Sequence, residues 1–199
     1  MKNCDNDEKD IDGTDRTNKS ILMIGCGTSR LVDVIMAKNP YSSNNNSAKS
    51  DDDVQFTLLD SSQTCIDELT RRYQKFDNVH CVCGDAIELT KTLSVSCPTT
   101  KAKIPQRYDT IIDKGLMDVL FCSDDWTSSV ETLFTEATNV LNRNGGGTYI
   151  LISYKLPNAT KQFLSEIADG LGYVWDFNCI GSTKRVTLSM ADPKKRCSL

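Results

Sequence analysis

SILMIGCGTSRL, residues 20–31, joins four consecutive large apolar residues to a glycine-rich turn. The apolar run at 21–24 predicts a strand buried on both faces, as in a parallel sheet. Gly25 and Gly27 predict a tight turn where the backbone approaches a ligand, because neither residue carries a Cβ. The helix expected next has one apolar stripe: Leu31, Val34 and Ile35. Strand, glycine turn and helix form the nucleotide-binding start of a doubly wound α/β fold.

The glycine turn also limits the kind of ligand. Arg30 stands where a pyrophosphate-binding fingerprint has its third glycine, and the Gly-Lys-Ser/Thr of a P-loop is absent. A glycine pair without that third glycine suits a ligand that has no pyrophosphate, such as S-adenosylmethionine (SAM). A plain packing corner between strand and helix is the alternative interpretation.

Asp60 ends the second expected strand, residues 54–59. The polar, low-complexity residues 40–53 precede this strand and predict an inserted loop. Once the loop is set aside, Asp60 follows Gly25 by about 20 residues, the spacing at which an acidic residue binds ribose hydroxyls in nucleotide-binding α/β units. We therefore predict a ribose contact, with capping of the next helix as the alternative.

Asp85 and Ala86 follow the third expected strand, residues 79–83. A carboxylate at this position accepts a hydrogen bond from an adenine amino group, and a neighbouring backbone N–H faces the ring. Capping of a short helix through Leu89 explains Asp85 equally well. Residues 91–106 are polar and contain two prolines, so they predict a second insertion.

Asp113 ends the fourth expected strand within residues 108–119, before a break at Lys114 and Gly115. The fourth strand lies beside the first in this fold, so Asp113 is expected over the crevice where ligands bind. The side chains expected to form a partly apolar entrance there are Leu116, Met117 and Phe121.

The end of the chain separates this fold from dinucleotide dehydrogenases. After a helix at 126–141, a strand at 148–153 and a further helix, residues 173–180 and 184–190 are joined by only three residues. So short a connection predicts a hairpin, with the last strand antiparallel. The expected fold is α/β: a Rossmann-like, doubly wound seven-stranded sheet, mostly parallel, with an antiparallel C-terminal hairpin strand.

Length and composition predict one domain at residues 20–193, between a disordered tail at 1–19 and a short tail at 194–199. The net charge of −4 argues against a nucleic-acid partner, and no apolar run approaches the roughly 20 residues of a membrane span. The nine cysteines include no Cys-x-x-Cys pair, which predicts free thiols in a reducing, cytoplasmic setting and no metal site.

The chain resembles class I, seven-stranded SAM-dependent methyltransferases, and more narrowly the group that includes the elongation factor 1A lysine methyltransferases. The resemblance rests on Ile-Gly-Cys-Gly-Thr-Ser at 24–29 and on Ile-Asp-Lys-Gly-Leu-Met-Asp at 112–118. It implies SAM as cofactor and a protein amine as methyl acceptor, such as a lysine of a translation factor.

The resemblance also implies the roles of the site residues. Gly25 and Gly27 would face the methionine part of SAM, Asp60 the ribose, and Asp85 and Ala86 the adenine. Cys26 and Ser61, next to these residues, would also belong to the SAM-binding set. Asp113 would stand beside the transferable methyl as the catalytic residue that positions the acceptor or the amino group of SAM.

One feature departs from that group, whose members carry an aromatic, charge-rich segment before the glycine motif. Residues 1–19 contain no Trp, Tyr or Phe and so do not supply this lid over SAM. A lid from elsewhere, a shortened gene product and a loss of catalysis are the open explanations. An inactive fold that binds SAM or a protein, a small-molecule methyltransferase and a nucleotide-dependent oxidoreductase are the alternative functions.

Deleting residues 42–49 should leave the melting temperature nearly unchanged, because this polar stretch has neither a helical nor an alternating apolar period. Thermal unfolding of the deletion variant beside the parent chain checks this. A loss of several degrees would show that the stretch packs against the domain.

Overall fold

The computed structural model describes residues 19–38, 54–94, 104–142, 146–153, 156–179 and 186–191. Its strands are β1 (Ser20–Ile24), β2 (Gln55–Asp60), β3 (Val79–Cys83), β4 (Thr110–Lys114), β5 (Thr148–Ser153), β6 (Val174–Cys179) and β7 (Val186–Ala191). Its helices are α1 (Leu31–Lys38), α2 (Gln63–Tyr73), the 3-10 turn η2 (Ala86–Glu88), α3 (Leu89–Ser94), α4 (Leu116–Leu120), α5 (Trp126–Val140) and α6 (Asn158–Gly170).

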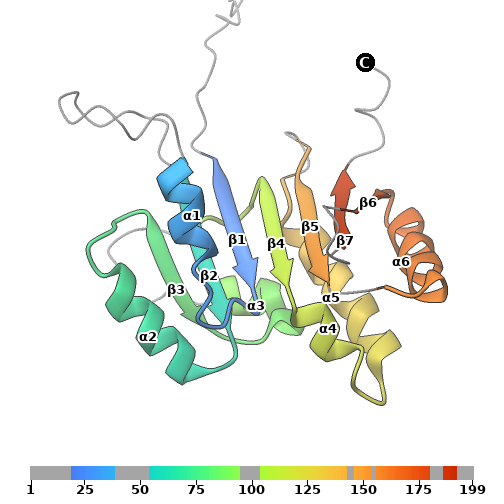
Figure 1. Cartoon of the computed structure of the whole chain (residues 1–199), viewed down its shortest axis with the longest axis horizontal. Coiled ribbons are helices and arrows are strands. Elements are labelled where there is room, and N and C mark those ends of the chain that lie inside the picture. Colours follow the sequence, from blue (N-terminus) through green and yellow to red (C-terminus); the bar gives the residue numbers. More distant parts are fainter. Residues whose placement is uncertain are drawn as a thin grey trace, which may run out of the picture.

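The strands form one sheet in the order β3-β2-β1-β4-β5-β7-β6. β1 to β5 pair in parallel, whereas β7 is antiparallel to both β5 and β6. In Figure 1 the arrowhead of β7 points opposite to those of β1, β4 and β5. The predicted Rossmann-like α/β class is confirmed.

The strand order reverses between β1 and β4. The chain first builds β2 and β3 on one side of β1 and then crosses to β4 on the other side. Because the connections after neighbouring parallel strands then leave in opposite directions, a crevice opens at the carboxyl ends of the strands. This topology therefore determines where a ligand can approach the sheet.

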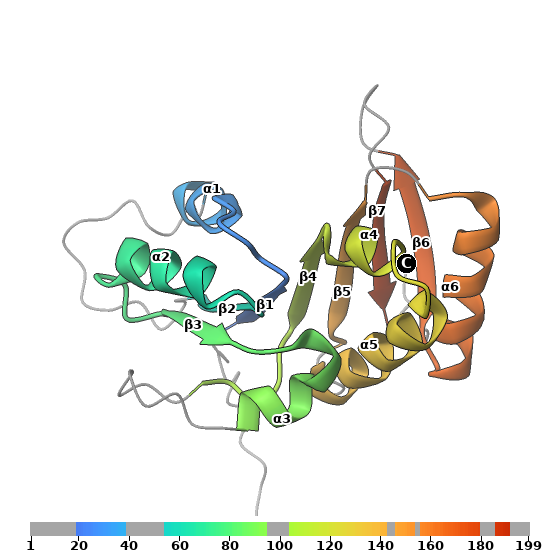
Figure 2. The same ribbon diagram turned by 90° about the horizontal axis from the view of Figure 1, so that it is seen from below.

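Helices cover both faces of the sheet, with α1 and α2 on one side and α3 and α5 on the other (Figure 2). The α1/α2 layer buries residues such as Val32, Ile66 and Leu69 against the sheet. The opposite core includes Leu89, Leu93, Leu133, Phe134, Leu164 and Ala168 from α3, α5 and α6. In α1 the buried side chain is Val32, whereas Val34, expected in the apolar stripe, is 48% exposed.

The insertion predicted at 91–106 is partly wrong. Helix α3 extends to Ser94, and Leu93 and Ile104 are buried in the main core. The apolar pair Leu89 and Leu93 lies one helical turn apart, so both side chains pack on the same side and are almost fully buried. Residues 1–18, 39–53, 95–103, 143–145, 154–155, 180–185 and 192–199 lie outside the described residues, and with them the predicted insertion at 40–53 and most of the two predicted tails.

His80 on β3 is a buried polar side chain, only 2% exposed. Its Nε2 lies 3.3 Å from Gln55 Oε1, and its Nδ1 has no hydrogen-bond partner. Burial lowers the pKa of His80, because the charged imidazolium loses its hydration inside the protein. The neutral ring is therefore the form that fits the fold.

His80→Gln should make the free energy of unfolding less sensitive to acid. Below about pH 6.5 an unfolded histidine binds a proton that folded His80 does not, so the parent loses stability there, by at most about 1.4 kcal/mol per pH unit. Urea unfolding at about pH 7.5 and about pH 5.5 measures this loss in both proteins. An equal loss in parent and variant would contradict the assignment.

Candidate functional site

A cavity of about 310 Å³ lies at the carboxyl ends of β1, β2, β3 and β4. This volume lies at the lower end of the range of small-molecule sites. The expected site residues that line it are Gly25, Asp60, Ser61, Asp85 and Ala86. The cavity thus coincides with the crevice at the switch point of the sheet.

Asp60 links the two loops on one side of the cavity. Its Oδ2 accepts a hydrogen bond from the Gly27 N–H (2.8 Å), and its Oδ1 accepts one from the Ser62 N–H (2.9 Å). The N-cap of α2 is Ser62, whose hydroxyl accepts from the Cys65 N–H, so the alternative role of Asp60 as helix cap belongs to Ser62. Each Asp60 oxygen keeps a further lone pair for a ligand hydroxyl.

The glycine turn contacts the opposite wall of the cavity. Gly25 and Gly27 have φ values of +56° and +51°, a backbone conformation that L-residues with a side chain rarely adopt. A Cβ on Gly25 would lie 2.7 Å from Leu116 Cβ, whereas a Cβ on Gly27 would meet nothing within 4 Å. The close approach of the turn to α4 therefore requires glycine at position 25.

Cys26 and Gly27 do not line the cavity. Cys26 is 7% exposed and packs into the α1/α2 core, and burial raises the pKa of its thiol to about 12. Arg72 of α2 donates to the carbonyls of Thr28 and Ser29 and so holds the outer part of the turn. Cys26 and Arg72 therefore hold the glycine turn in place without lining the cavity.

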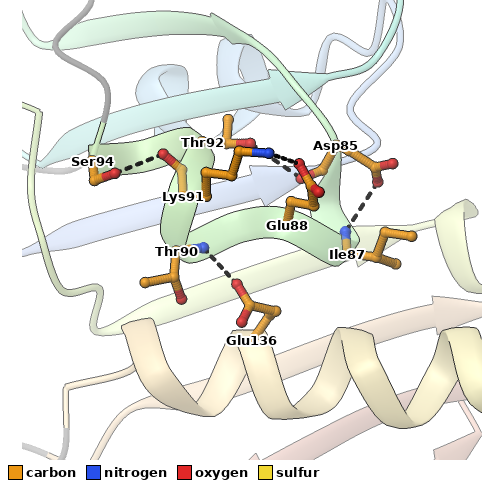
Figure 3. A network of polar contacts seen from close by, with 8 residues as sticks. All are labelled: Asp85, Ile87, Glu88, Thr90, Lys91, Thr92, Ser94 and Glu136. Atoms are coloured by element: carbon orange, nitrogen blue, oxygen red, sulfur yellow. Dashed lines mark hydrogen bonds and ion pairs between the residues drawn. The ribbon is translucent and has the colours of Figure 1, made fainter.

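Asp85 both lines the cavity and caps η2, so its two predicted roles are compatible in the structure. Its Oδ1 accepts from the Ile87 N–H (3.0 Å), and Figure 3 shows this bond within a polar network along η2 and α3. In the same network Glu136 of α5 accepts from the Thr90 N–H (2.6 Å). The network fixes the edge of the crevice where the adenine contact is predicted.

Asp113 occupies a different place from the one predicted. Its side chain is 0% exposed and does not line the cavity. Its oxygens accept from the N–H groups of Leu116 and Met117 and from the hydroxyl of Tyr149. β4 therefore turns this carboxylate toward the α5 face, at the N-terminal end of α4, and not into the cavity where its catalytic and cofactor-contact roles were predicted.

The wall beside β4 contains residues that the site prediction did not include. They are Lys114, Gly115 and Val119, which lie beside the expected Leu116, and Leu59 and Gly84 complete the lining. Of the expected apolar entrance only Leu116 lines the cavity, because Met117 is fully buried and Phe121 packs edge-to-face on Trp126. The alternation of side chains along β4 is the sequence signal that could have found Lys114: if Asp113 faces one side of the sheet, Lys114 faces the other.

Two negative findings apply to the described part of the chain. There, no group of three or more His, Cys, Asp or Glu side chains is placed to hold a metal ion. Its helices also include none that is long and apolar enough to cross a membrane.

Comparison with solved structures identifies the fold. A methyltransferase from Pyrococcus furiosus is 17% identical, over 88% of this chain and 76% of its own, with a TM-score of 0.55. The chain has the methyltransferase fold. The magnesium protoporphyrin IX methyltransferase of Synechocystis PCC 6803, solved with bound SAM, is 11% identical over 89% of this chain and 72% of its own (TM-score 0.56).

The N-methyltransferase NodS of Bradyrhizobium japonicum WM9, in complex with S-adenosyl-L-homocysteine, is 12% identical over 88% of this chain and 78% of its own (TM-score 0.57). For eight of the matching solved structures, this chain spans from 50% to 78% of their lengths. Neither a protein-family model nor a curated protein sequence matches the chain. At these identities the likeness establishes the fold alone.

Gly25→Ala should destabilise the protein more than Gly27→Ala. Both changes place a side chain at positive φ, which costs about 1–2 kcal/mol, but only the first also pushes against Leu116. Urea unfolding of the two variants and the parent measures the difference. Equal losses of unfolding free energy would show that α4 moves away from the turn without cost.

Proposed function

We propose that the chain is a SAM-dependent methyltransferase that transfers a methyl group to an amine, with a protein lysine as the favoured acceptor. The observation that carries the proposal is the position of Asp60. This carboxylate lies at the carboxyl end of β2, on a cavity at the switch point, in a chain with the methyltransferase fold. A carboxylate at that position suits the two hydroxyls of a ribose.

The residues around the cavity fit the parts of SAM. The Asp60 oxygens keep lone pairs for the ribose, and Asp85 and Ala86 line the end assigned to adenine. Gly25 leaves the backbone accessible beside the methionine part. When bound, SAM supplies an activated methyl group, so the task left to the protein is to align donor and acceptor.

The wall beside β4 suits an amine acceptor. A lysine in water has a pKa near 10.4, so removing the proton from its ammonium group at pH 7 costs about 4.6 kcal/mol. Leu116 and Val119 provide apolar surface, and Lys114, a cationic residue, lines the same wall. Desolvation and a neighbouring positive charge both lower the pKa of an incoming amine.

A protein acceptor is supported by the likeness of residues 112–118 to the Asp-Lys-Gly motif. A small-molecule amine is the second candidate, because the solved neighbour NodS is named an N-methyltransferase. The free thiols of Cys26, Cys65, Cys83 and Cys122 suit a reducing compartment, so the proposal includes a cytoplasmic location.

Asp60→Ala should weaken SAM binding at least tenfold, because two charge-assisted hydrogen bonds worth about 1.5–3 kcal/mol each are lost. Titration calorimetry on parent and variant measures the affinity. Asp67→Ala is the matched control: Asp67 is an exposed carboxylate on α2 that accepts only from Gln63 among its described contacts. Unchanged affinity in a folded Asp60→Ala variant would overturn the ribose assignment.

The same variants test the activity. Incubated with SAM carrying a labelled methyl group and a cell extract, the parent and Asp67→Ala should label an acceptor, and Asp60→Ala should label far less. Label in a protein band supports a protein acceptor, and label in the small-molecule fraction supports the second candidate. A parent that binds SAM but labels nothing would favour the inactive fold.

A further inference from the structure

Helix α4 forms one wall of the cavity and is held by buried polar groups from two strands. Leu116 and Val119 of this five-residue helix line the cavity. From β4, Asp113 accepts the N–H groups of Leu116 (2.9 Å) and Met117 (3.2 Å). From β5, the Ser153 hydroxyl donates to Asp118 of α4. Because so short a helix has little stability of its own, these contacts determine its position.

Tyr149 of β5 completes the attachment from the far side of the carboxylate. Its hydroxyl donates to Asp113 Oδ2 at 2.9 Å, and its side chain is 0% exposed. Its ring packs against Phe134 and Trp175, with centroids 5.2 and 6.1 Å away. Packing therefore fixes the ring of Tyr149 in an orientation that directs its hydroxyl at Asp113.

We propose that Tyr149 and Asp113 are positioning residues that set the affinity of the crevice for its cofactor by holding α4 against the glycine turn. Neither residue lines the cavity. The effect passes through Leu116, whose Cβ would lie only 2.7 Å from a Cβ on Gly25, so a small shift of α4 changes the shape of the methionine end. The inference rests on the proposed binding of SAM.

The attachment of α4 depends on the charge of Asp113. Burial raises the pKa of Asp113 to about 7, Asp118 adds to this rise, and the Tyr149 hydroxyl and the N–H groups of Met117 and Leu116 oppose it. Burial and the Asp113 carboxylate raise the pKa of Tyr149 far above its ordinary value, so Tyr149 stays a donor. The charged carboxylate binds the α4 N–H groups more strongly than the neutral acid does.

Stability and cofactor affinity should therefore respond to pH in opposite directions. Because the folded pKa of Asp113 is raised, the stability linked to this group is present at acid pH and is lost as pH rises through about 7. SAM affinity should instead rise as the pH passes through about 7, where Asp113 of the folded protein ionises, because the ionised carboxylate holds α4 more tightly. A merely structural role would move both quantities together.

The test compares Tyr149→Phe with Tyr108→Phe. Tyr108 is also 0% exposed and precedes β4, at the end of the sheet opposite the cavity. Its hydroxyl donates to Thr57 in the middle of β2 (3.0 Å). Each variant loses one buried hydrogen bond, so the melting temperatures should fall similarly. We expect SAM affinity, measured by calorimetry, to fall about five- to tenfold in Tyr149→Phe and less than about twofold in Tyr108→Phe.

The pH profile of SAM affinity provides the second measurement. Tyr149→Phe should move the midpoint upward, since a group that lowers the pKa of Asp113 is lost. Asp113→Asn, which does not titrate, should remove the step in affinity near pH 7. Amide hydrogen exchange at Leu116 and Met117 should accelerate in Tyr149→Phe and stay unchanged in Tyr108→Phe.

Equal SAM affinities and equal exchange in the two tyrosine variants would overturn the inference and leave the proposed function intact. An unmoved pH midpoint in Tyr149→Phe would also overturn it. A parent that binds no SAM would overturn the proposed function and with it the link to cofactor affinity. In that case, unchanged exchange at Leu116 and Met117 would refute the positioning of α4 as well.

Discussion

The residues that follow the strands at the carboxyl end of a parallel sheet have backbone N–H groups that need hydrogen-bond acceptors. In this protein two carboxylates provide them. Asp60 at the end of β2 accepts from Gly27 and Ser62, and Asp113 on β4 accepts from Leu116 and Met117. Without an acceptor, each buried N–H would cost about 1–3 kcal/mol. These bonds determine where the loops and α4 lie, and so they shape the cavity between them.

The two carboxylates serve opposite faces of the sheet. Asp60 joins the glycine turn to α2, on the side of the α1/α2 core, whereas Asp113 and Tyr149 lie on the side of α4 and α5. Asp60 borders the cavity, but Asp113 is fully buried at the N-terminal end of α4. The register explains the difference: Ile24 of β1 pairs with Leu59 and with Asp113, so Asp60 lies one residue further along its strand and faces the other side of the sheet. Asp60 borders the cavity, whereas Asp113 holds the helix that forms one of its walls.

The crevice combines acidic groups at one end with a basic and apolar wall at the other. Asp60 and Asp85 lie near the ends of β2 and β3, and Lys114, Leu116 and Val119 lie beyond β4. This arrangement suits the proposed methyl transfer, which depends more on the alignment of methyl donor and acceptor than on acid–base chemistry. The buried Asp113 then contributes through the position of α4, where its charge state matters most near neutral pH.

Local patterns in the sequence determined the strands, the glycine turn and the place of Asp60, because apolar runs, positive-φ glycines and strand-end acidic residues depend on near neighbours. The direction of Asp113 was decided by tertiary structure: only the pairing of β4 between β1 and β5 brings it to Tyr149 and puts α4 over it. The burial of Leu93 and Ile104 likewise required the core formed by α3 and α5. A motif shows which residues lie at a strand end, but whether a carboxylate meets a ligand or a helix depends on packing from distant parts of the chain.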